Sequence, residues 1–511
     1  MSNVVSDNLH KLIRSMTKAE KRYFKIFSSR HILGDENNYR LLFAAIDKQE
    51  VYDEDRLVKK FSDKQFTHRF SISKNRLYNA ILKSLDAFHS NSSVEAQLNR
   101  QIHSAEILYH KSLYDQSLKL LNSARKVAEK YEKYPQVLSI IRWEKRIIEK
   151  SNYAGVSVRD LETIATVDRA LAQKIAAFDE LWNVKSRVFH SLFSKGKVRS
   201  GLEEKEFKAM LDELKLNVPV DEQGIENQYL MNHVQGAFYF AVGKYEECYP
   251  YLLSNISLIE EYPHLFDEEP GMYLSVLSNA VYVGLRLSKP EEARKNLDRL
   301  RKFPKVLESQ MNTDLEARVF STIKSTELTL FAHTNDFEQG MALLPDIEKG
   351  LDHFGTQVSP VKRAQLLFNS GVICIGAEKF HDALRFINQL LNDSEIDSSL
   401  DIHCMARMLD LVIHLELGHR DLLPYTLRSS QRYLQVRQRV FQFEKVFLDF
   451  INEYLKKRQG KKEPELFSEL IEKMEELKKD AFEAPVFEYF DFIAWAKNHV
   501  TGKPYRKELA A

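Results

Sequence analysis

The sequence predicts an all-α protein in which helical hairpins repeat along the chain. Apolar residues recur at helical spacing almost everywhere, and the Asn-Gly or Asp-Gly turns that are typical of β-hairpins do not occur. The 511 residues include only 17 glycines and 13 prolines, so we expect short loops. A short motif also recurs at a nearly constant interval. Together these observations predict an α-α superhelix of stacked hairpins.

The length and composition fit this architecture. A single hydrophobic core does not grow to 511 residues, but a solenoid does, because each repeat packs only against its neighbours. Apolar residues make up 44% of the chain and charged residues 29%, which is typical of a folded, soluble protein. The formal net charge of +1 gives the whole chain no field that would attract nucleic acid or a membrane.

The repeated motif predicts the turn between the two helices of each hairpin. It consists of a turn residue, an aromatic residue or proline two positions later, two polar residues and a small residue. We expect the turn residue to end the first helix and acidic residues to favour the start of the second. The small residue would let the two helices approach closely. The five copies span residues 112–117, 243–248, 288–293, 335–340 and 378–383.

A second small residue often lies twelve positions before the first, in the preceding helix. The predicted packing pairs are Ala105 with Ser117, Gly236 with Cys248, and Gly371 with Ala383, while Ala293 faces the larger Val281 and Gly340 faces Leu328. This pattern resembles the tetratricopeptide repeat family, in which small residues at the eighth and twentieth positions pack the helices together. The resemblance is clearest over residues 232–256 and 367–391, without the family's tryptophan at the fourth position. It implies a concave surface that binds a peptide or another protein.

The interval between copies is longer than the ~34 residues of a standard tetratricopeptide repeat. The last three intervals between the small residues are 45, 47 and 43 residues. The 131 residues between Ser117 and Cys248 therefore predict two further repeats, near Leu161 and Gly201, and a sixth visible turn lies at Gly418. A period of about 44 residues predicts helices of about 17–20 residues, and a HEAT-like stack has a similar period.

Different helical segments flank the repeats, which we place at residues 93–423. Residues 1–92 predict a mildly basic helical domain, because residues 1–90 contain 17 Lys and Arg against 11 Asp and Glu. Thr17 and Glu20 form a capping box that opens one of its helices. Further helices are expected near 38–49, 53–61 and 73–88. Residues 424–500 predict a helical cap, with helices near 431–457, 463–479 and 486–500, and residues 501–511 a flexible tail.

The sequence contains no motif of a catalytic or cofactor site, such as a P-loop, G-x-G-x-x-G, H-E-x-x-H or G-x-S-x-G. His103, Glu106 and His110 share one helix face, which either holds zinc or forms a polar stripe on the outer surface. Glu-x-x-His pairs at residues 261–264, 378–381 and 416–419 fall at predicted turns, where they would not reach a bundle core. We therefore expect neither enzymatic activity nor a cofactor.

The chain is expected to be cytoplasmic. Cys248, Cys374 and Cys404 are odd in number and widely spaced, which indicates free thiols in a reducing compartment, the first two buried. The first sixteen residues lack the apolar segment of a signal peptide. No segment approaches the ~20 apolar residues of a membrane span.

The expected role is to bind a protein or peptide. Aromatic residues of the repeats either fill the core and turns or line a peptide groove: Tyr239, Tyr245, Tyr249, Tyr251, Phe337 and Phe380. The alternative is a transcription regulator, because the layout is similar to bacterial peptide-sensing regulators that join a DNA-binding domain to tetratricopeptide-like repeats. Cations that could contact nucleic acid lie on the domain's first helix and at the start of its last, which Ser73 would cap: Lys18, Lys21, Arg22, Lys25, Lys74 and Arg76.

Overall fold

The computed structural model describes residues 7–31, 36–62, 69–90, 92–217, 224–306, 311–396, 401–456 and 463–508. Every regular element in these ranges is helical, so the protein is all-α, as the sequence predicts. Within the same ranges, no helix is both long enough and apolar enough to cross a membrane.

The chain divides into two compact units, Met1–Leu171 and Ala172–Ala511. The division falls inside one long helix, α9 (Val158–Lys195). The boundaries that we expect at residues 92, 423 and 500 stay predictions, and each unit is described by itself below.

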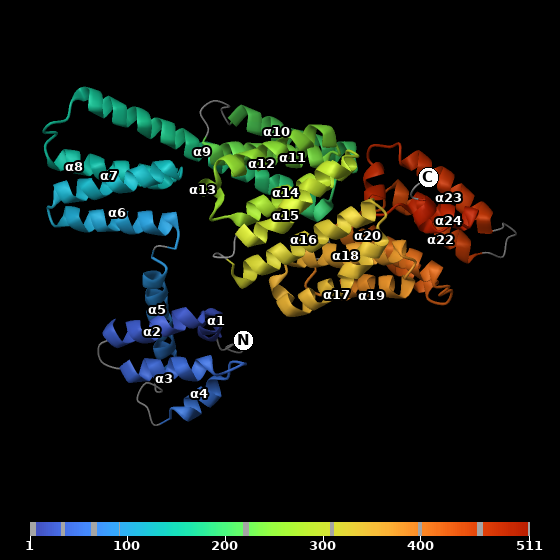
Figure 1. Cartoon of the computed structure of the whole chain (residues 1–511), viewed down its shortest axis with the longest axis horizontal. Helices are drawn as coiled ribbons and strands as arrows, with labels where there is room; N and C mark the ends of the chain where they lie inside the picture. Colours follow the sequence, from blue (N-terminus) through green and yellow to red (C-terminus); the bar gives the residue numbers. More distant parts are fainter. Residues whose placement is uncertain are drawn as a thin grey trace. The chain divides into compact units, whose positions relative to one another are not determined.

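The first unit begins with five helices around a small core. Its buried side chains include Phe24, Phe43 and Leu77. Three further helices then pack against one another in succession and lie side by side (Figure 1). The elements are α1 (Asn8–Ser15), α2 (Lys18–His31), α3 (Glu36–Asp47), α4 (Glu54–Lys60), α5 (Phe70–Phe88), α6 (Val94–His110), α7 (Tyr114–Lys130) and α8 (Tyr134–Lys150).

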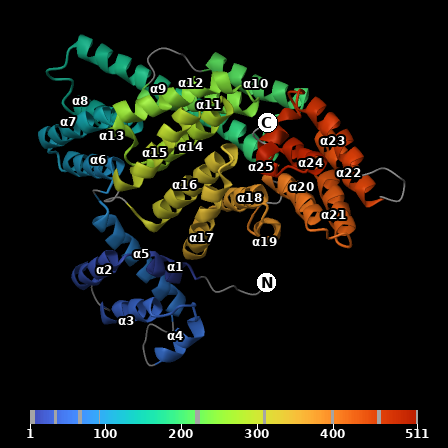
Figure 2. The same ribbon diagram turned by 45° about the vertical axis from the view of Figure 1, so that its right-hand side comes forward.

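The second unit is a series of helical hairpins. The pairs α11/α12, α14/α15, α16/α17 and α18/α19 each pack together, and α14, α16, α18 and α20 contact one another in series (Figure 2). The elements after α9 are α10 (Gly201–Asn217), α11 (Ile225–Ala241), α12 (Tyr245–Glu261), α13 (Pro263–Phe266), α14 (Pro270–Arg286), α15 (Pro290–Val306), α16 (Thr313–His333), α17 (Phe337–Phe354), η2 (Gly355–Gln357), α18 (Pro360–Gly376), α19 (Phe380–Asn392), α20 (Asp401–Glu416), α21 (Leu423–Val436), α22 (Gln442–Leu455), α23 (Glu463–Leu477), η3 (Ala484–Glu488), α24 (Phe492–Thr501) and α25 (Tyr505–Glu508).

The hairpin turns lie where the repeated motif places them. At each of the six expected turns the chain takes one left-handed residue with positive φ: Ser112, Gly243, Ser288, Asn335, Glu378 and Gly418. The next backbone N–H then donates to a carbonyl five residues earlier, as from Lys379 to Cys374 at 2.8 Å. This is the Schellman ending of a helix, which satisfies carbonyls that the last turn leaves free. The motif therefore works mainly as a helix stop signal.

The predicted small residues are buried where two helices of a hairpin meet. Ser117 Oγ donates a hydrogen bond of 2.8 Å to the Ala105 carbonyl, and Cys248 Sγ lies 3.2 Å from the Gly236 carbonyl. Ala293, Gly371 and Ala383 are also buried. Gly340 is buried too, but a Cβ there would meet Ile373 of α18, which belongs to the next hairpin. A Cβ on Gly371 would lie 2.8 Å from the Ile387 side chain of α19, which would have to shift to make room.

The repeats between residues 117 and 248 are less regular than predicted. The turn expected near Gly201 is present at Gly196, with φ +74°, and α10 begins at Gly201. Leu161 instead lies within α9, a helix of 38 residues that no 44-residue hairpin accommodates. A further turn at Glu132, with φ 52°, separates α7 from α8, at a position that is not among the predicted turns.

The C-terminal helices differ from the prediction. The single helix expected over residues 431–457 is broken into α21 and α22, because Gln438 adopts a φ of 54° and ends α21. The helix expected over 486–500 is the 3-10 helix η3 followed by α24. Within the expected tail, residues 505–508 form α25, and Tyr505 is buried and stacks on Phe490. Residues 509–511 lie outside the described residues.

Candidate functional site

A surface hollow in the first unit combines apolar and basic side chains. It has a volume of about 360 Å³ and lies between α2 and α5, where it is lined by Lys18, Ala19, Arg22, Tyr23, Ile26 and Phe88. Ile26 is 47% exposed and Phe88 40% exposed, although both are large apolar side chains. The rings of Tyr23 and Phe88 lie 5.2 Å apart and join the two helices across the hollow.

The apolar pattern of α2 explains why this surface exists. Phe24 points into the core and is fully buried, while Tyr23 and Ile26 lie on a neighbouring face. An amphipathic helix normally has one apolar stripe, so α2 has apolar side chains beyond those its own core uses. Phe88 is the last residue of α5 and lies next to that second face.

The N-terminus of α2 is fixed by the predicted capping box. The Thr17 amide donates to Glu20 Oε2 at 2.6 Å, and the Glu20 amide donates to Thr17 Oγ1 at 3.2 Å. His89 Nε2, after the end of α5, lies 2.6 Å from Glu20 Oε1. Burial raises the pKa of Glu20, but the hydrogen bonds from Thr17 and His89 outweigh it and lower the pKa. The Glu20 carboxylate is therefore bound within the unit beside the hollow.

The six cations proposed for nucleic-acid contact have different environments. Lys21 Nζ lies 2.6 Å from Asp47 Oδ1, and Lys74 forms an ion pair with Glu54. Lys18 and Arg22 line the hollow, and Lys25 and Arg76 are exposed. The structure thus brings Lys18 and Arg22 together with apolar side chains, whereas Lys21 and Lys74 hold α2 and α5 to their neighbours.

The start of the last N-terminal helix is not where the sequence suggested. α5 begins at Phe70, and Ser73 is buried within its first turns instead of capping it. The cations that follow Ser73 are therefore not at a helix start. The DNA-binding arrangement expected for this segment required Ser73 as the N-cap and Lys74 and Arg76 as free cations. Ser73 does not cap α5, and Lys74 forms an ion pair with Glu54.

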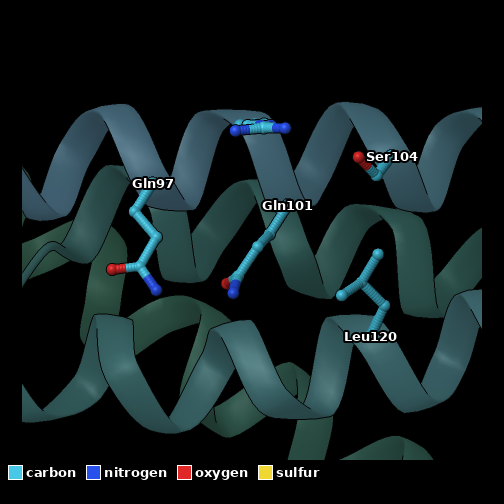
Figure 3. Close-up of a pocket in the computed structure, with 5 residues that line it drawn as sticks. Gln97, Gln101, Ser104 and Leu120 are labelled. Atoms are coloured by element: carbon cyan, nitrogen blue, oxygen red, sulfur yellow. The ribbon is translucent and has the colours of Figure 1, made fainter. Parts of the chain in front are cut away.

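A second, smaller hollow lies between α6 and α7 and is mostly polar (Figure 3). It measures about 180 Å³ and is lined by Gln97, Arg100, Gln101, Ser104 and Leu120. Figure 3 shows the amides of Gln97 and Gln101 extending from α6 toward the α7 side, with Leu120 as the apolar residue. It offers hydrogen-bonding groups without a sizeable apolar floor.

The residues that suggested a metal site are on the exposed surface of α6. His103 Nδ1 lies 3.1 Å from Glu106 Oε2, and His110 Nε2 lies 3.9 Å from Glu106 Oε1. Within the described ranges, no group of three His, Cys, Asp or Glu side chains is placed to hold a metal ion.

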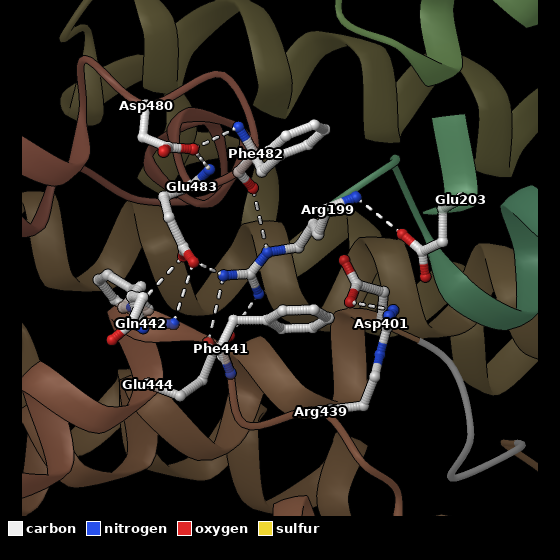
Figure 4. Close-up of polar contacts among 11 residues, drawn as sticks. Arg199, Glu203, Asp401, Arg439, Phe441, Gln442, Glu444, Asp480, Phe482 and Glu483 are labelled. Atoms are coloured by element: carbon white, nitrogen blue, oxygen red, sulfur yellow. Dashed lines mark hydrogen bonds and ion pairs between the residues drawn. The ribbon is translucent and has the colours of Figure 1, made fainter. Parts of the chain in front are cut away.

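The second unit contains a buried cluster of charges around Arg199, in the segment between α9 and α10 (Figure 4). Its guanidinium donates to both carboxylate oxygens of Glu444 and, at 2.6 Å, to Glu483, and it lies 4.1 Å from the centre of the Phe441 ring. Arg199 is only 6% exposed. Burial alone would lower its pKa, but Glu444 and Glu483 hold the pKa above its usual value.

The same segment joins the turns of several hairpins to the C-terminal helices. Lys197 forms an ion pair with Glu488 of η3 and a hydrogen bond with Tyr245. Tyr245, at the start of α12, and Tyr282, in α14, both donate to the Glu488 carboxylate, at 2.8 and 2.7 Å. Arg286 donates to the Glu488 backbone carbonyl at 2.7 Å. Burial raises the pKa of Glu488, but the charges of Lys197 and Arg286 outweigh it and lower the pKa.

The aromatic residues considered for a peptide groove serve internal packing. Tyr245 binds Glu488, Tyr239 stacks on Tyr251 with ring centres 5.8 Å apart, and Tyr249 donates to Glu292. Phe337 is buried and Phe380 packs at the edge of the largest core cluster. Each of these residues therefore contacts neighbouring side chains of its own unit. Tyr249 and Phe337 are buried, and the other four are partly buried.

The three cysteines are free and buried. Burial raises the pKa of the Cys248, Cys374 and Cys404 thiols to about 12, so they are held as neutral thiols. This favours a packing role, because the thiolate is the reactive form of cysteine.

The sequence predicts only part of the hollow between α2 and α5. Its pattern of charges indicates Lys18 and Arg22 as candidate contacts, but it does not indicate that Ile26 and Phe88 are exposed. The available signal was the sequence of α2, where Tyr23, Phe24, Ile26 and Phe27 spread apolar side chains over more than one helix face. No protein-family model and no curated protein matches this chain.

Proposed function

We propose that this chain is a non-enzymatic, cytoplasmic scaffold of tetratricopeptide-like hairpins that binds a partner protein. The hollow between α2 and α5 is the observation that carries this proposal. It exposes Ile26 and Phe88 on a surface shared by two helices that the Thr17–Glu20 capping box and the core below hold in place. Exposed apolar side chains clustered in one depression are typical of protein-binding surfaces.

The alternative of a DNA-binding domain has less support. Interfaces with DNA are polar and strongly cationic, and they use many free Lys and Arg residues. Lys21 and Lys74 are engaged in ion pairs within the unit, and the two remaining lining cations border an apolar floor. A floor of this kind contributes to binding when it meets apolar side chains of another protein.

Capture of partners by the full-length chain, with variants of the hollow, tests the proposal. The chain is immobilised, incubated with an extract of its own cells, and the bound proteins are identified by mass spectrometry. The double substitution Ile26→Asp and Phe88→Asp should abolish capture of a specific partner. The matched control is Ile107→Asp on α6, because Ile107 is 45% exposed, close to the 47% of Ile26, and does not line the hollow.

Capture that persists in the double variant, or that fails for the unmodified chain, would contradict the proposal. A circular dichroism spectrum and melting temperature equal to those of the unmodified chain establish that the variants are folded. This check is informative because both substituted side chains already contact solvent, so a charged replacement leaves no buried charge.

A further inference from the structure

The hollow between α2 and α5 carries a charge pattern that indicates what kind of protein segment it accepts. Lys18, Arg22 and Lys25 are spaced by four and three residues, so they lie along one face of α2. Ala19, Tyr23 and Ile26 have the same spacing and form the adjacent face. A row of positive charges therefore runs beside a row of apolar side chains along the helix.

These three cations are available to a ligand. Lys18, Arg22 and Lys25 are exposed, and none of them takes part in the ion pairs found within the described part of the chain. The carboxylate nearest to them in sequence, Glu20, is held by Thr17 and His89. The neighbouring Lys21 is neutralised by Asp47, so the free charge is concentrated on the side of α2 that borders the hollow.

The dimensions fit a helix. α2 has 14 residues, which corresponds to a length of about 21 Å or roughly four turns. The hollow of about 360 Å³ is shallow and open to solvent, and it is shared by α2 and α5. Two parallel rows, one apolar and one charged, match a helix that has apolar residues every three or four positions and acidic residues beside them.

Resting on the proposed protein-binding role of this hollow, we infer that its ligand is an acidic amphipathic helix of a partner protein. The apolar residues of that helix contact Tyr23, Ile26 and Phe88, and its carboxylates contact Lys18, Arg22 and Lys25. The apolar floor provides affinity, and the cations fix the orientation and favour acidic over basic sequences.

Direct binding to the full-length protein tests this inference. The probe is a fluorescein-labelled synthetic peptide of about 16 residues, with Leu every three or four positions and Glu on both sides of them. Two comparison peptides replace each Glu by Lys or each Leu by Ser. Labelled duplex DNA of mixed sequence and vesicles of phosphatidylserine and phosphatidylcholine are the other two ligands. Anisotropy measures binding of the labelled peptides and DNA, and sedimentation measures binding to the vesicles.

The acidic Leu peptide should bind, and neither comparison peptide should bind with similar affinity. Lys18→Glu combined with Arg22→Glu should weaken binding at least about tenfold, because attraction becomes repulsion at two contacts. Ile26→Asp should abolish it. Lys126→Glu on α7 and Ile107→Asp on α6 are the matched controls, because both residues are exposed and neither lines the hollow, so they should leave the affinity unchanged.

No binding of the acidic peptide, or equal binding by the hollow variants and the controls, would overturn the inference. Preference for DNA or for vesicles would overturn it in the same way. If Ile26→Asp with Phe88→Asp still removes a captured cellular protein while the acidic peptide does not bind, the proposed function stands and only the ligand chemistry is wrong. If both experiments fail, the hollow is not a binding surface.

Discussion

Gly376 shows how a single residue limits the packing between two successive hairpins. It is the last residue of α18, and a Cβ placed on it would lie 2.1 Å from the ring of Phe337. Phe337 is buried within a core cluster, so its ring must displace neighbouring side chains if it shifts. We expect Gly376→Ala to destabilise the protein by about 1–3 kcal/mol, which is the usual cost of overpacking a core.

Gly236 provides the matched control for this prediction. It is also a buried glycine in a first helix, but a Cβ there would lie 3.5 Å from Tyr251 Cβ, which is an ordinary contact. Gly236→Ala should be neutral or stabilise the protein by up to about 1 kcal/mol, because alanine favours helix. Urea unfolding monitored by circular dichroism compares the two midpoints. Equal effects of the two substitutions would show that crowding by Phe337 is not the cause.

Asp410 should make stability depend on pH. It is buried in α20, and its Oδ1 lies 3.5 Å from His414 Nε2 without forming a hydrogen bond. Burial raises its pKa to about 6, against a smaller lowering by Arg407. The folded state therefore binds a proton more tightly than the unfolded chain, so this group's contribution to stability falls as pH rises from about 4 to about 6.

Replacing the buried Asp410 carboxyl by an amide should remove this loss of stability at higher pH. Asp410→Asn is expected to stabilise the protein at pH 7 on the order of 1–3 kcal/mol, and the gain should vanish near pH 4. Thermal melts at several pH values measure it. Asp449→Asn on α22 is the control, because Asp449 is exposed and should show no such dependence. A gain from Asp410→Asn that is independent of pH would rule out titration of Asp410 as its origin.

At the element scale, the start of α2 tests whether the capping box positions the hollow. Thr17→Ala removes the hydroxyl that accepts from the Glu20 amide, and it should cost about 1 kcal/mol, as for other N-caps. Hydrogen exchange should show the loss in the first turn of α2. Ser29→Ala is the control, because Ser29 Oγ only donates to the Ile26 carbonyl on an exposed turn. Equal protection in the two variants would mean that the cap contributes nothing.

The helices that the sequence predicted best are those with local start and stop signals. A period near 44 residues implied helices of about 17–20 residues, and α11, α12, α14 and α18 each have 17. The capping box of α2 and the turns at Ser288 and Glu378 could also be predicted, because each depends on residues that are close together in the sequence. α9 and the break at Gln438 were missed, because glutamine rarely adopts positive φ and nothing in the sequence marks a 38-residue helix.

At the scale of the whole second unit, the buried ion pairs could not be predicted. Arg199 and Glu444 are 245 residues apart in sequence, and Lys197 and Glu488 are 291 apart. No periodicity or local spacing connects such positions. Gly196 is part of the same arrangement, since it has a φ of +74° and a Cβ there would lie 2.6 Å from Asp401. The sequence predicted the repeated hairpins but not the contacts that join their turns to the C-terminal helices.

Because of these long-range contacts, we expect replacement of Glu488 to destabilise segments that are far apart in the sequence. Lys197, Tyr245, Tyr282 and Arg286 all contact it, and the Lys197 and Glu488 side chains are 9% and 17% exposed. Glu488→Ala would leave the buried Lys197 and the Arg286 side chain, which is 20% exposed, without their carboxylate. Breaking a buried ion pair typically costs about 3–5 kcal/mol. Amide exchange should therefore accelerate together around residues 197, 245 and 286.

The control for this prediction is Glu292→Ala. The Glu292 carboxylate accepts a hydrogen bond from Tyr249, so the substitution also removes a contact between a tyrosine and a carboxylate. Glu292 is about half exposed, so its loss should be small and should affect only α12 and α15. Simultaneous loss of protection at three sites separated by more than 40 residues requires a shared contact. If Glu488→Ala instead loosened only the residues next to position 488, the C-terminal helices would not hold the hairpin turns together, and each hairpin would depend on its immediate neighbours alone.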